Sequence, residues 1–151
     1  RLIGDLRPTA LEELGLVPAL RWLVERTLGP AGVEATVTVA GDVGPLPPPL
    51  ETALFRIAQE AVQNVARHAA ATRAWLSLRV GRHTVQLTIE DNGRGLEAPG
   101  PVPGPRHDAP LSGGYGLLGI RERVDLYGGC FALTSRPGQG VRLSVTLPRV
   151  R

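Results

Sequence analysis

The sequence places a carboxylate at the inward-facing end of an expected β-strand. Residues 84–90, TVQLTIE, alternate polar and apolar side chains. The three apolar residues of this stretch point toward the core, and Asp91 shares their face. A buried carboxylate costs free energy unless donors satisfy it. An exocyclic amine of a ligand would be such a donor; a backbone amide or a threonine of the protein would also serve, because Asp-Asn-Gly is a common turn sequence.

Two glycine clusters flank a long segment that has no apolar period. The first, at 93–95, follows the expected strand, and the second, GYGLLG at 114–119, precedes an expected helix. The second cluster matches the G-x-G-x-x-G of dinucleotide-binding proteins, but it follows a proline-rich loop instead of a strand, and the first cluster opens no helix. A P-loop is excluded because the sequence has no lysine. The long loop between the clusters is typical of a functional segment.

A third group of polar side chains lies on the longest expected helix, residues 50–71. Glu60, Asn64 and His68 stand at positions i, i+4 and i+8, with Arg67 beside them. At about 100° per residue these positions drift by only about 80° around a helix, so they form one polar stripe. An apolar stripe of leucine, alanine and valine lies next to it. Asn64 is therefore expected at the boundary between core and solvent.

The elements that must position these residues predict a two-layer α/β sandwich. Adjacent strands joined by short turns imply antiparallel neighbours, so we expect a mixed, mostly antiparallel sheet with helices on one face and water on the other. Thr9 and Glu12 have the spacing of a capping box, and PLPPP at 45–49 reads as a rigid connector. The expected elements are helical residues 9–29 broken near 15–18, strand 33–41, helix 50–71, strands 74–80 and 84–90, helix 117–127, and strands 130–136 and 141–147.

Composition limits the possible function classes. The 151 residues carry a net charge of +3, and the basic residues, all arginine, are scattered. A nucleic-acid surface would need clustered charge with stacking aromatics, so we expect no nucleic-acid partner. No apolar run approaches the ~18 residues of a membrane span. The single Cys130 cannot form an internal disulfide and is expected to be a small core residue. Because the chain opens mid-pattern without methionine, we expect a piece of a longer protein.

Three motifs together resemble the ATP-binding catalytic domain of sensor histidine kinases. EAVQNVARHA (60–69) resembles the N box of that family, DNGRG (91–95) its first glycine box, and GYGLLGIRERV (114–124) its second glycine box. Their order and spacing agree with the family across residues 50 to 147. The opening, LRPTALEELGLVPAL, resembles the junction that follows the dimerisation helices in the nitrate-sensor subfamily. The resemblance implies the Bergerat fold, which gyrase and MutL share.

The resemblance implies nucleotide-binding roles for the polar residues. Asp91 would accept a hydrogen bond from the adenine amino group, and Asn64 would hold Mg²⁺ on the triphosphate of ATP, because Mg²⁺ needs few protein oxygens when phosphate and water supply the rest. Glu60 would act either as a base or as a residue that orients a ligand of the metal. Arg67 and His68 would either contact phosphate or form a solvated helix end.

The glycine boxes would shape the nucleotide site. Gly93 and Gly95 would let the backbone approach the nucleotide, and residues 96–113 would form the ATP lid. The second box would provide the hinge of the lid and offer amides to phosphate at a helix N-terminus, through Gly114, Tyr115, Gly116 and Leu117.

For the whole protein, the resemblance implies transfer of the γ-phosphoryl of MgATP to a histidine. That histidine would lie on an upstream dimerisation domain, and a response regulator would receive the phosphoryl group next. Residues 1–8 would end the dimerisation-domain linker, and 9–151 would form the catalytic domain, cytoplasmic and monomeric alone but homodimeric at full length. Membrane anchoring of the longer protein stays open. The alternatives are a serine kinase of the anti-sigma type and a scaffold domain that binds no nucleotide.

Overall fold

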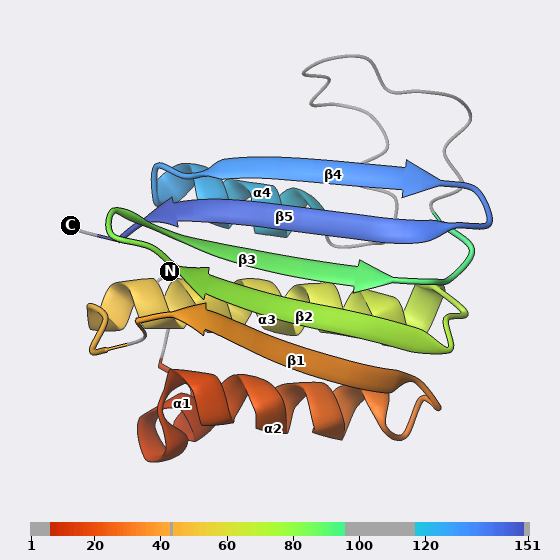
Figure 1. The fold of residues 1–151 in the computed structure, drawn as a ribbon, viewed down its shortest axis with the longest axis horizontal. Helices are drawn as coiled ribbons and strands as arrows, with labels where there is room; N and C mark the ends of the chain where they lie inside the picture. Colours follow the sequence, from red (N-terminus) through yellow and green to blue (C-terminus); the bar gives the residue numbers. More distant parts are fainter. Residues whose placement is uncertain (1–6, 43, 96–116, 150–151) are drawn as a thin grey trace.

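A computed structural model describes residues 7–42, 44–95 and 117–149 of the chain. Its helices all cover one face of a single sheet (Figure 1). The sheet has five strands in the order β1-β2-β3-β5-β4. The elements are α1 (Thr9–Leu14), α2 (Leu16–Leu28), β1 (Glu34–Gly41), α3 (Pro48–His68), β2 (Arg73–Val80), β3 (Thr84–Asp91), α4 (Leu117–Leu126), β4 (Cys130–Arg136) and β5 (Gly140–Pro148).

The sheet is mixed and mostly antiparallel, as predicted. β1 pairs parallel to β2, and α3 supplies the crossover that a parallel pair requires. The β2–β3, β3–β5 and β4–β5 pairs are antiparallel. β3 therefore lies in the middle of the sheet, and its last residue, Asp91, lies at the edge of the core. The two-layer α/β sandwich predicted from the sequence is confirmed.

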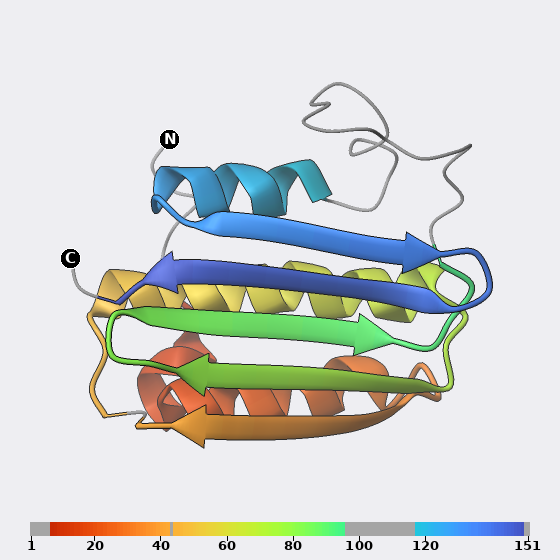
Figure 2. The same ribbon diagram turned by 45° about the horizontal axis from the view of Figure 1, so that its top comes forward.

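The core lies between α3 and the inner face of the sheet. Val85, Leu87 and Ile89 of β3 are buried as their alternation predicts. Helix α3 packs its apolar stripe against the core, and it also contacts α4 (Figure 2). α2 packs against α3 and β1, whereas α4 packs against α3, β4 and β5. The fully buried α3 residues in this layer are Leu50, Leu54, Ile57 and Ala58.

Two predictions about helix starts are wrong. α1 has Pro8 as its N-cap and shows no side-chain cap, so Thr9 is already the first helical residue and makes no capping box with Glu12. Pro48 and Pro49 belong to the first turn of α3 instead of to a connector. Proline is tolerated there because the first-turn amides have no intrahelical acceptor, and its φ already suits a helix.

Cys130 is exposed, which contradicts the prediction of a core residue. The register explains the difference, because Cys130 pairs with Thr146 while Phe131 pairs with the buried Val145. Successive side chains point to opposite faces of a sheet. The alternation of β4 therefore places Phe131 inward and Cys130 on the outer face.

Candidate functional site

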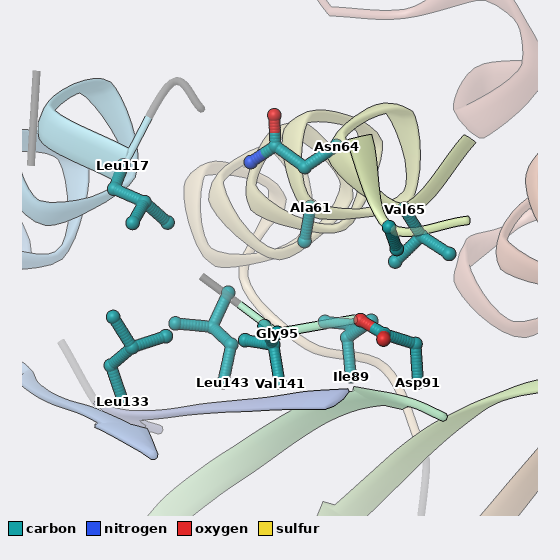
Figure 3. Close-up of a pocket in the computed structure, with 11 residues that line it drawn as sticks. Ala61, Asn64, Val65, Ile89, Asp91, Gly95, Leu117, Leu133, Val141 and Leu143 are labelled. Carbon is teal, nitrogen blue, oxygen red and sulfur yellow. The ribbon is translucent and has the colours of Figure 1, made fainter. Parts of the chain in front are cut away.

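A pocket opens between α3 and the ends of β3 and β5. Its empty volume, including the part open to solvent, is about 450 Å³. Figure 3 shows α3 above the pocket, the strands below it and Leu117 of α4 at one side. The lining residues are Ala61, Asn64, Val65, Ala69, Ile89, Asp91, Gly95, Leu117, Leu133, Val141 and Leu143.

Asp91 is the buried acid of this pocket. Its side chain shares the inner face of β3, as the alternation predicts, and only 5% of the residue is exposed. One carboxylate oxygen, Oδ1, accepts a hydrogen bond of 2.7 Å from the backbone amide of Gly93. Burial raises the pKa of Asp91 above its ordinary value, while the amides of Gly93 and Val141 pull the pKa down and Glu90 adds a smaller upward push. The protein's own donors thus only partly offset the cost of burying this charge.

The loop after Asp91 is held tightly against neighbouring backbone. The amide oxygen of Asn92 accepts hydrogen bonds from the backbone N–H groups of Thr72 and Arg73, at 3.0 and 2.9 Å. A Cβ at Gly93 would overlap the carbonyl oxygen of Ala69. Gly93 is therefore needed for a close approach of the loop to the end of α3.

Arg94 joins the same loop to the C-terminus of α3. Its Nε donates to the carbonyl of His68 at 2.9 Å, and its backbone amide donates to the carbonyl of Ala69 at 2.8 Å. Both acceptors belong to the helix end, where carbonyls lack intrahelical partners and a cation is favourable. The adjacent Gly95 has a φ of 80° and lines the pocket. Arg94 thus fixes the loop that carries Gly95 relative to α3, which forms the opposite side of the pocket.

The amide oxygen of Asn64, a residue that lines the pocket, is buried and unpaired. The residue is only 8% exposed, and its Oδ1 has no hydrogen-bond partner within the described part of the chain. In Figure 3 this oxygen points away from the strands, on the opposite side of the pocket from Asp91. A buried acceptor left unpaired costs about 1–3 kcal/mol. A ligand donor or a cation at this position would recover that cost.

The side chains that could ligate a metal here fit Mg²⁺ bound through a nucleotide better than a metal held by the protein alone. Across residues 7–42, 44–95 and 117–149, no group of three or more His, Cys, Asp or Glu side chains could hold an ion. Mg²⁺ commonly takes one or two protein oxygens and fills its octahedron with phosphate and water. The free Oδ1 of Asn64 suits that arrangement.

The structure brings together some, but not all, of the predicted site residues. Asn64, Asp91, Gly95 and Leu117 line the pocket, and Gly93 supports it from behind. Three further predicted residues of α3 do not line it: Glu60 and His68 are half-buried and Arg67 is exposed. The predictions for Gly114, Tyr115, Gly116 and the lid at 96–113 lie outside the described residues.

The apolar walls of the pocket were missed as site residues. Ala61 and Val65 come from α3, and Ile89, Leu133 and Leu143 come from three neighbouring strands. Alternation could have placed Ile89 and Leu143 on the face of Asp91. Nothing in the local sequence marks Leu133 as their neighbour, because its position depends on the order of the strands. A flat, apolar ring system suits such walls.

Comparison with known proteins identifies the family. Residues 50–151 match the family described as "Histidine kinase-, DNA gyrase B-, and HSP90-like ATPase". The chain belongs to this family, which makes it an ATP-binding domain. No helix among the described residues is long and apolar enough to cross a membrane.

Its relatives are sensor kinases. The "Signal transduction histidine-protein kinase/phosphatase DegS" of Brevibacillus brevis is 30% identical over 148 residues, covering 98% of this chain and 36% of that protein. The "Signal transduction histidine-protein kinase/phosphatase UhpB" of Salmonella typhimurium is 36% identical over 150 residues, covering 99% of this chain and 28% of that protein. The chain thus spans about a third of the length of these relatives.

Solved structures support the fold. The catalytic domain of histidine kinase ThkA aligns with a TM-score of 0.67 at 16% identity, over 93% of this chain and 92% of that one. A histidine kinase domain from Erythrobacter litoralis EL346 aligns with a TM-score of 0.65 at 23% identity, over 89% of this chain and 65% of that one. Both likenesses concern the fold, and they agree with the predicted Bergerat sandwich.

Asp91→Asn is expected to stabilise the domain at neutral pH. Because the pKa of Asp91 is raised above its ordinary 3.8 in the folded state, the folded protein holds this proton more tightly than the unfolded chain does. The extra stability that protonated Asp91 gives the folded parent protein is fully present below pH 3.8, and it is lost as the pH rises through the folded-state pKa of Asp91. The difference in unfolding free energy between the variant and the parent should therefore grow in favour of the variant as the pH rises.

Urea denaturation from pH 4 to 7.5 measures this difference. Glu90→Gln is the control, since it removes a neighbouring but exposed carboxylate. A pH-independent difference for Asp91→Asn would contradict the expectation.

Proposed function

We propose that this domain binds MgATP in the pocket between α3 and the strands, for transfer of the γ-phosphoryl group to a histidine. The observation that carries the proposal is the pairing of the buried Asp91 carboxylate with the unpaired Asn64 oxygen on opposite sides of an apolar pocket. One is an acceptor for the base, and the other is a ligand for the metal at the phosphates.

The adenine ring binds at the Asp91 end of the pocket. A carboxylate oxygen of Asp91 accepts a hydrogen bond from the exocyclic amine, beside the Gly93 amide that donates to Oδ1. Ile89 and Leu143 provide apolar contact below the ring, and Ala61 and Val65 provide it from α3. Such a site selects a base with a donor at this position, because any other base leaves the carboxylate unpaired in a buried place.

The triphosphate extends from the base toward Asn64 and the start of α4. Mg²⁺ bound there supplies charge neutralisation to the phosphates, and Asn64 supplies an oxygen to hold it. Leu117 opens α4, whose N-terminus favours negative charge.

Three further residues, Arg67, His68 and Glu60, lie outside the pocket lining but on the helix that carries Asn64. We assign Arg67 and His68 to phosphate contact and Glu60 to orienting a ligand of the metal. Gly114, Tyr115 and Gly116 complete the phosphate site in this proposal.

The phosphoryl acceptor comes from outside this chain. Phosphoryl transfer depends mainly on positioning and charge stabilisation, so the domain needs no covalent chemistry of its own. We assign residues 1–8 to the end of a dimerisation-domain linker, 9–151 to the catalytic domain and 96–113 to its lid. The acceptor histidine then lies on the dimerisation domain, and a response regulator receives the group next. The isolated domain is monomeric and cytoplasmic, and the longer protein is a homodimer.

Asp91→Asn is expected to weaken ATP binding by about 100-fold or more, because the adenine amine then meets an amide that cannot accept as strongly and presents competing donors. Glu90→Gln, one residue away on the outer face of the sheet, should bind ATP like the parent. Isothermal titration calorimetry with Mg²⁺ present measures both. The parent should also prefer ATP over GTP by at least about tenfold, since GTP places a carbonyl oxygen against the carboxylate. Equal binding of ATP by parent and Asp91→Asn would refute the adenine assignment.

Asn64→Ala is expected to abolish the effect of Mg²⁺ on ATP affinity. In the parent, Mg²⁺ should tighten ATP binding by roughly tenfold relative to EDTA, corresponding to about 1.4 kcal/mol. The variant should bind ATP with the same weak affinity in both conditions. Gln63→Ala, which removes the neighbouring half-buried amide of α3, serves as the control and should keep the Mg²⁺ dependence. Retention of that dependence in Asn64→Ala would place the metal elsewhere.

The chemical class of the phosphorylated residue separates the kinase hypotheses. A longer version of this protein with its upstream sequence, incubated with radiolabelled MgATP, should incorporate acid-labile phosphate, the property of a phosphohistidine. Acid-stable phosphate on a partner protein would support the serine-kinase alternative. No nucleotide binding at all would support the scaffold alternative. The chain alone, with Asp91 and Asn64 intact, should bind MgATP and incorporate little phosphate.

A further inference from the structure

The turn between β4 and β5 lies beside the acid of the pocket. It consists of residues 137–139 and closes the hairpin whose second strand begins at Gly140. This turn lies at the same end of the sheet as the last residues of β3 and α3 (Figures 1 and 2). The register of the β3–β5 pair places Val141 beside Asp91, the last residue of β3. The turn and the acid are therefore neighbours, although they are far apart in the sequence.

The turn is bonded to the loop that follows Asp91. The backbone amide of Gly138 donates to the carbonyl of Arg94 at 2.7 Å, and the backbone amide of Arg94 donates to the carbonyl of Ala69 at 2.8 Å. The loop is thus held from two sides, by the β4–β5 turn and by the end of α3. Because both bonds join backbone to backbone, they depend on how closely the chain segments approach each other.

Gly140 allows such an approach on the side of the turn. A Cβ at this position would overlap the carbonyl oxygen of Asp91 and would lie 3.1 Å from the Cα of Asn92. The backbone of Gly140 also has a φ of 88°, which residues with a side chain rarely adopt. The start of β5 therefore lies directly against the backbone of Asp91, and only glycine fits there.

This approach brings a second donor to the Asp91 carboxylate. The backbone amide of Val141 donates to the carboxylate from β5, and the amide of Gly93 donates to it from the loop. The two donors belong to different segments of the chain, so together they restrict rotation of the carboxylate about its side-chain bonds. A carboxylate has about four acceptor sites, so capacity remains for a ligand. Val141 also lines the pocket with its side chain (Figure 3).

We propose that Gly140 is a positioning residue for recognition of the base. It lets the Val141 amide reach Asp91, and that hydrogen bond fixes the direction in which the carboxylate accepts from an exocyclic amine. A binding site must hold its polar groups to within about 0.5 Å of the productive geometry. The Gly93 bond alone would leave the carboxylate free to turn about that bond. The role of Gly140 rests on the proposed binding of adenine at Asp91.

The alternative is that Gly140 serves only to close the hairpin. Loss of the glycine would then lower the stability of the domain, but it would not change the preference of the pocket among bases. A positioning role instead links Gly140 to the ratio of the affinities for ATP and GTP, because that preference depends on a correctly oriented acceptor.

Gly140→Ala tests the proposal, with Gly128→Ala as the matched control. Gly128 also has a positive φ, 75°, but a Cβ there would meet no heavy atom of the described residues within 4 Å. It lies between α4 and β4, at the other end of the sheet (Figures 1 and 2). The control therefore reproduces the backbone strain without the overlap at Asp91.

Isothermal titration calorimetry with Mg²⁺ present gives the affinities. We expect Gly140→Ala to bind ATP at least ~10-fold more weakly than the parent and to prefer ATP over GTP by less than ~3-fold. Gly128→Ala should keep the parental affinity and the parental preference. Circular dichroism and urea denaturation verify that both variants are folded under the conditions of the titration.

Nuclear magnetic resonance without nucleotide tests the hydrogen bond itself. In the parent, the amide proton of Val141 should shift downfield as Asp91 ionises, with the same midpoint as the carboxyl carbon of Asp91, because a charged acceptor strengthens the bond. In Gly140→Ala this shift should be lost. The pKa of Asp91 should also rise in that variant, since the Val141 amide lowers it in the parent. Gly128→Ala should leave both signals unchanged.

Two results would overturn the positioning role and leave the proposed function intact. They are a Gly140→Ala protein that keeps the parental preference for ATP, and a Val141 amide that does not titrate with Asp91 in the parent. Absence of ATP binding by the folded parent would instead refute the proposed function, and the positioning role with it. If Gly140→Ala does not fold, the titration of the parent decides by itself.

Discussion

The charge of Asp91 is the constraint on which the rest of this structure depends. The inner position at the end of the central strand β3 would suit an apolar residue, and burial there raises the pKa of the carboxyl group. The fold supplies backbone donors, the Gly93 amide at 2.7 Å and the Val141 amide. That is enough to keep the site folded but leaves acceptor capacity unused. An acceptor that is not fully hydrogen-bonded in an apolar pocket lowers the stability of the fold, but it can bind a ligand that brings a donor. Functional sites commonly differ from cores in this way.

The loop that follows Asp91 transmits this constraint to α3. Gly93 brings the loop against Ala69, and Arg94 bonds to two carbonyls at the helix end. Asn64 lies about one helical turn before that end. Asp91 and Asn64, on either side of the pocket, are therefore linked through the hydrogen bonds between this loop and the end of α3, although they are distant in the sequence. A change in the loop would displace both at once, so the base and metal assignments are coupled.

Local patterns predicted most of the fold and the polar half of the site. Alternation placed Asp91 on the inner face, and helical spacing placed Asn64 at the core boundary, because both depend on periods of two and 3.6 residues that the sequence displays. The position of Leu133 and the approach of Arg94 to His68 could not be predicted in this way. They follow from strand order and from how closely the loop packs on α3, which are products of the whole chain. The wrong prediction of a Thr9 cap has a local cause instead, since Pro8 in extended conformation begins the helix without a side-chain acceptor.

α3 connects the two surfaces of the domain. Its first turns carry Pro48 and Thr52, which hold Arg7, and its later turns carry Asn64 and Val65, which line the pocket. With 21 residues it is about 31 Å long, and its apolar stripe is buried against the sheet along that length. A packed helix of this kind has little freedom to bend, so the attachment point of the chain and the pocket keep a fixed separation.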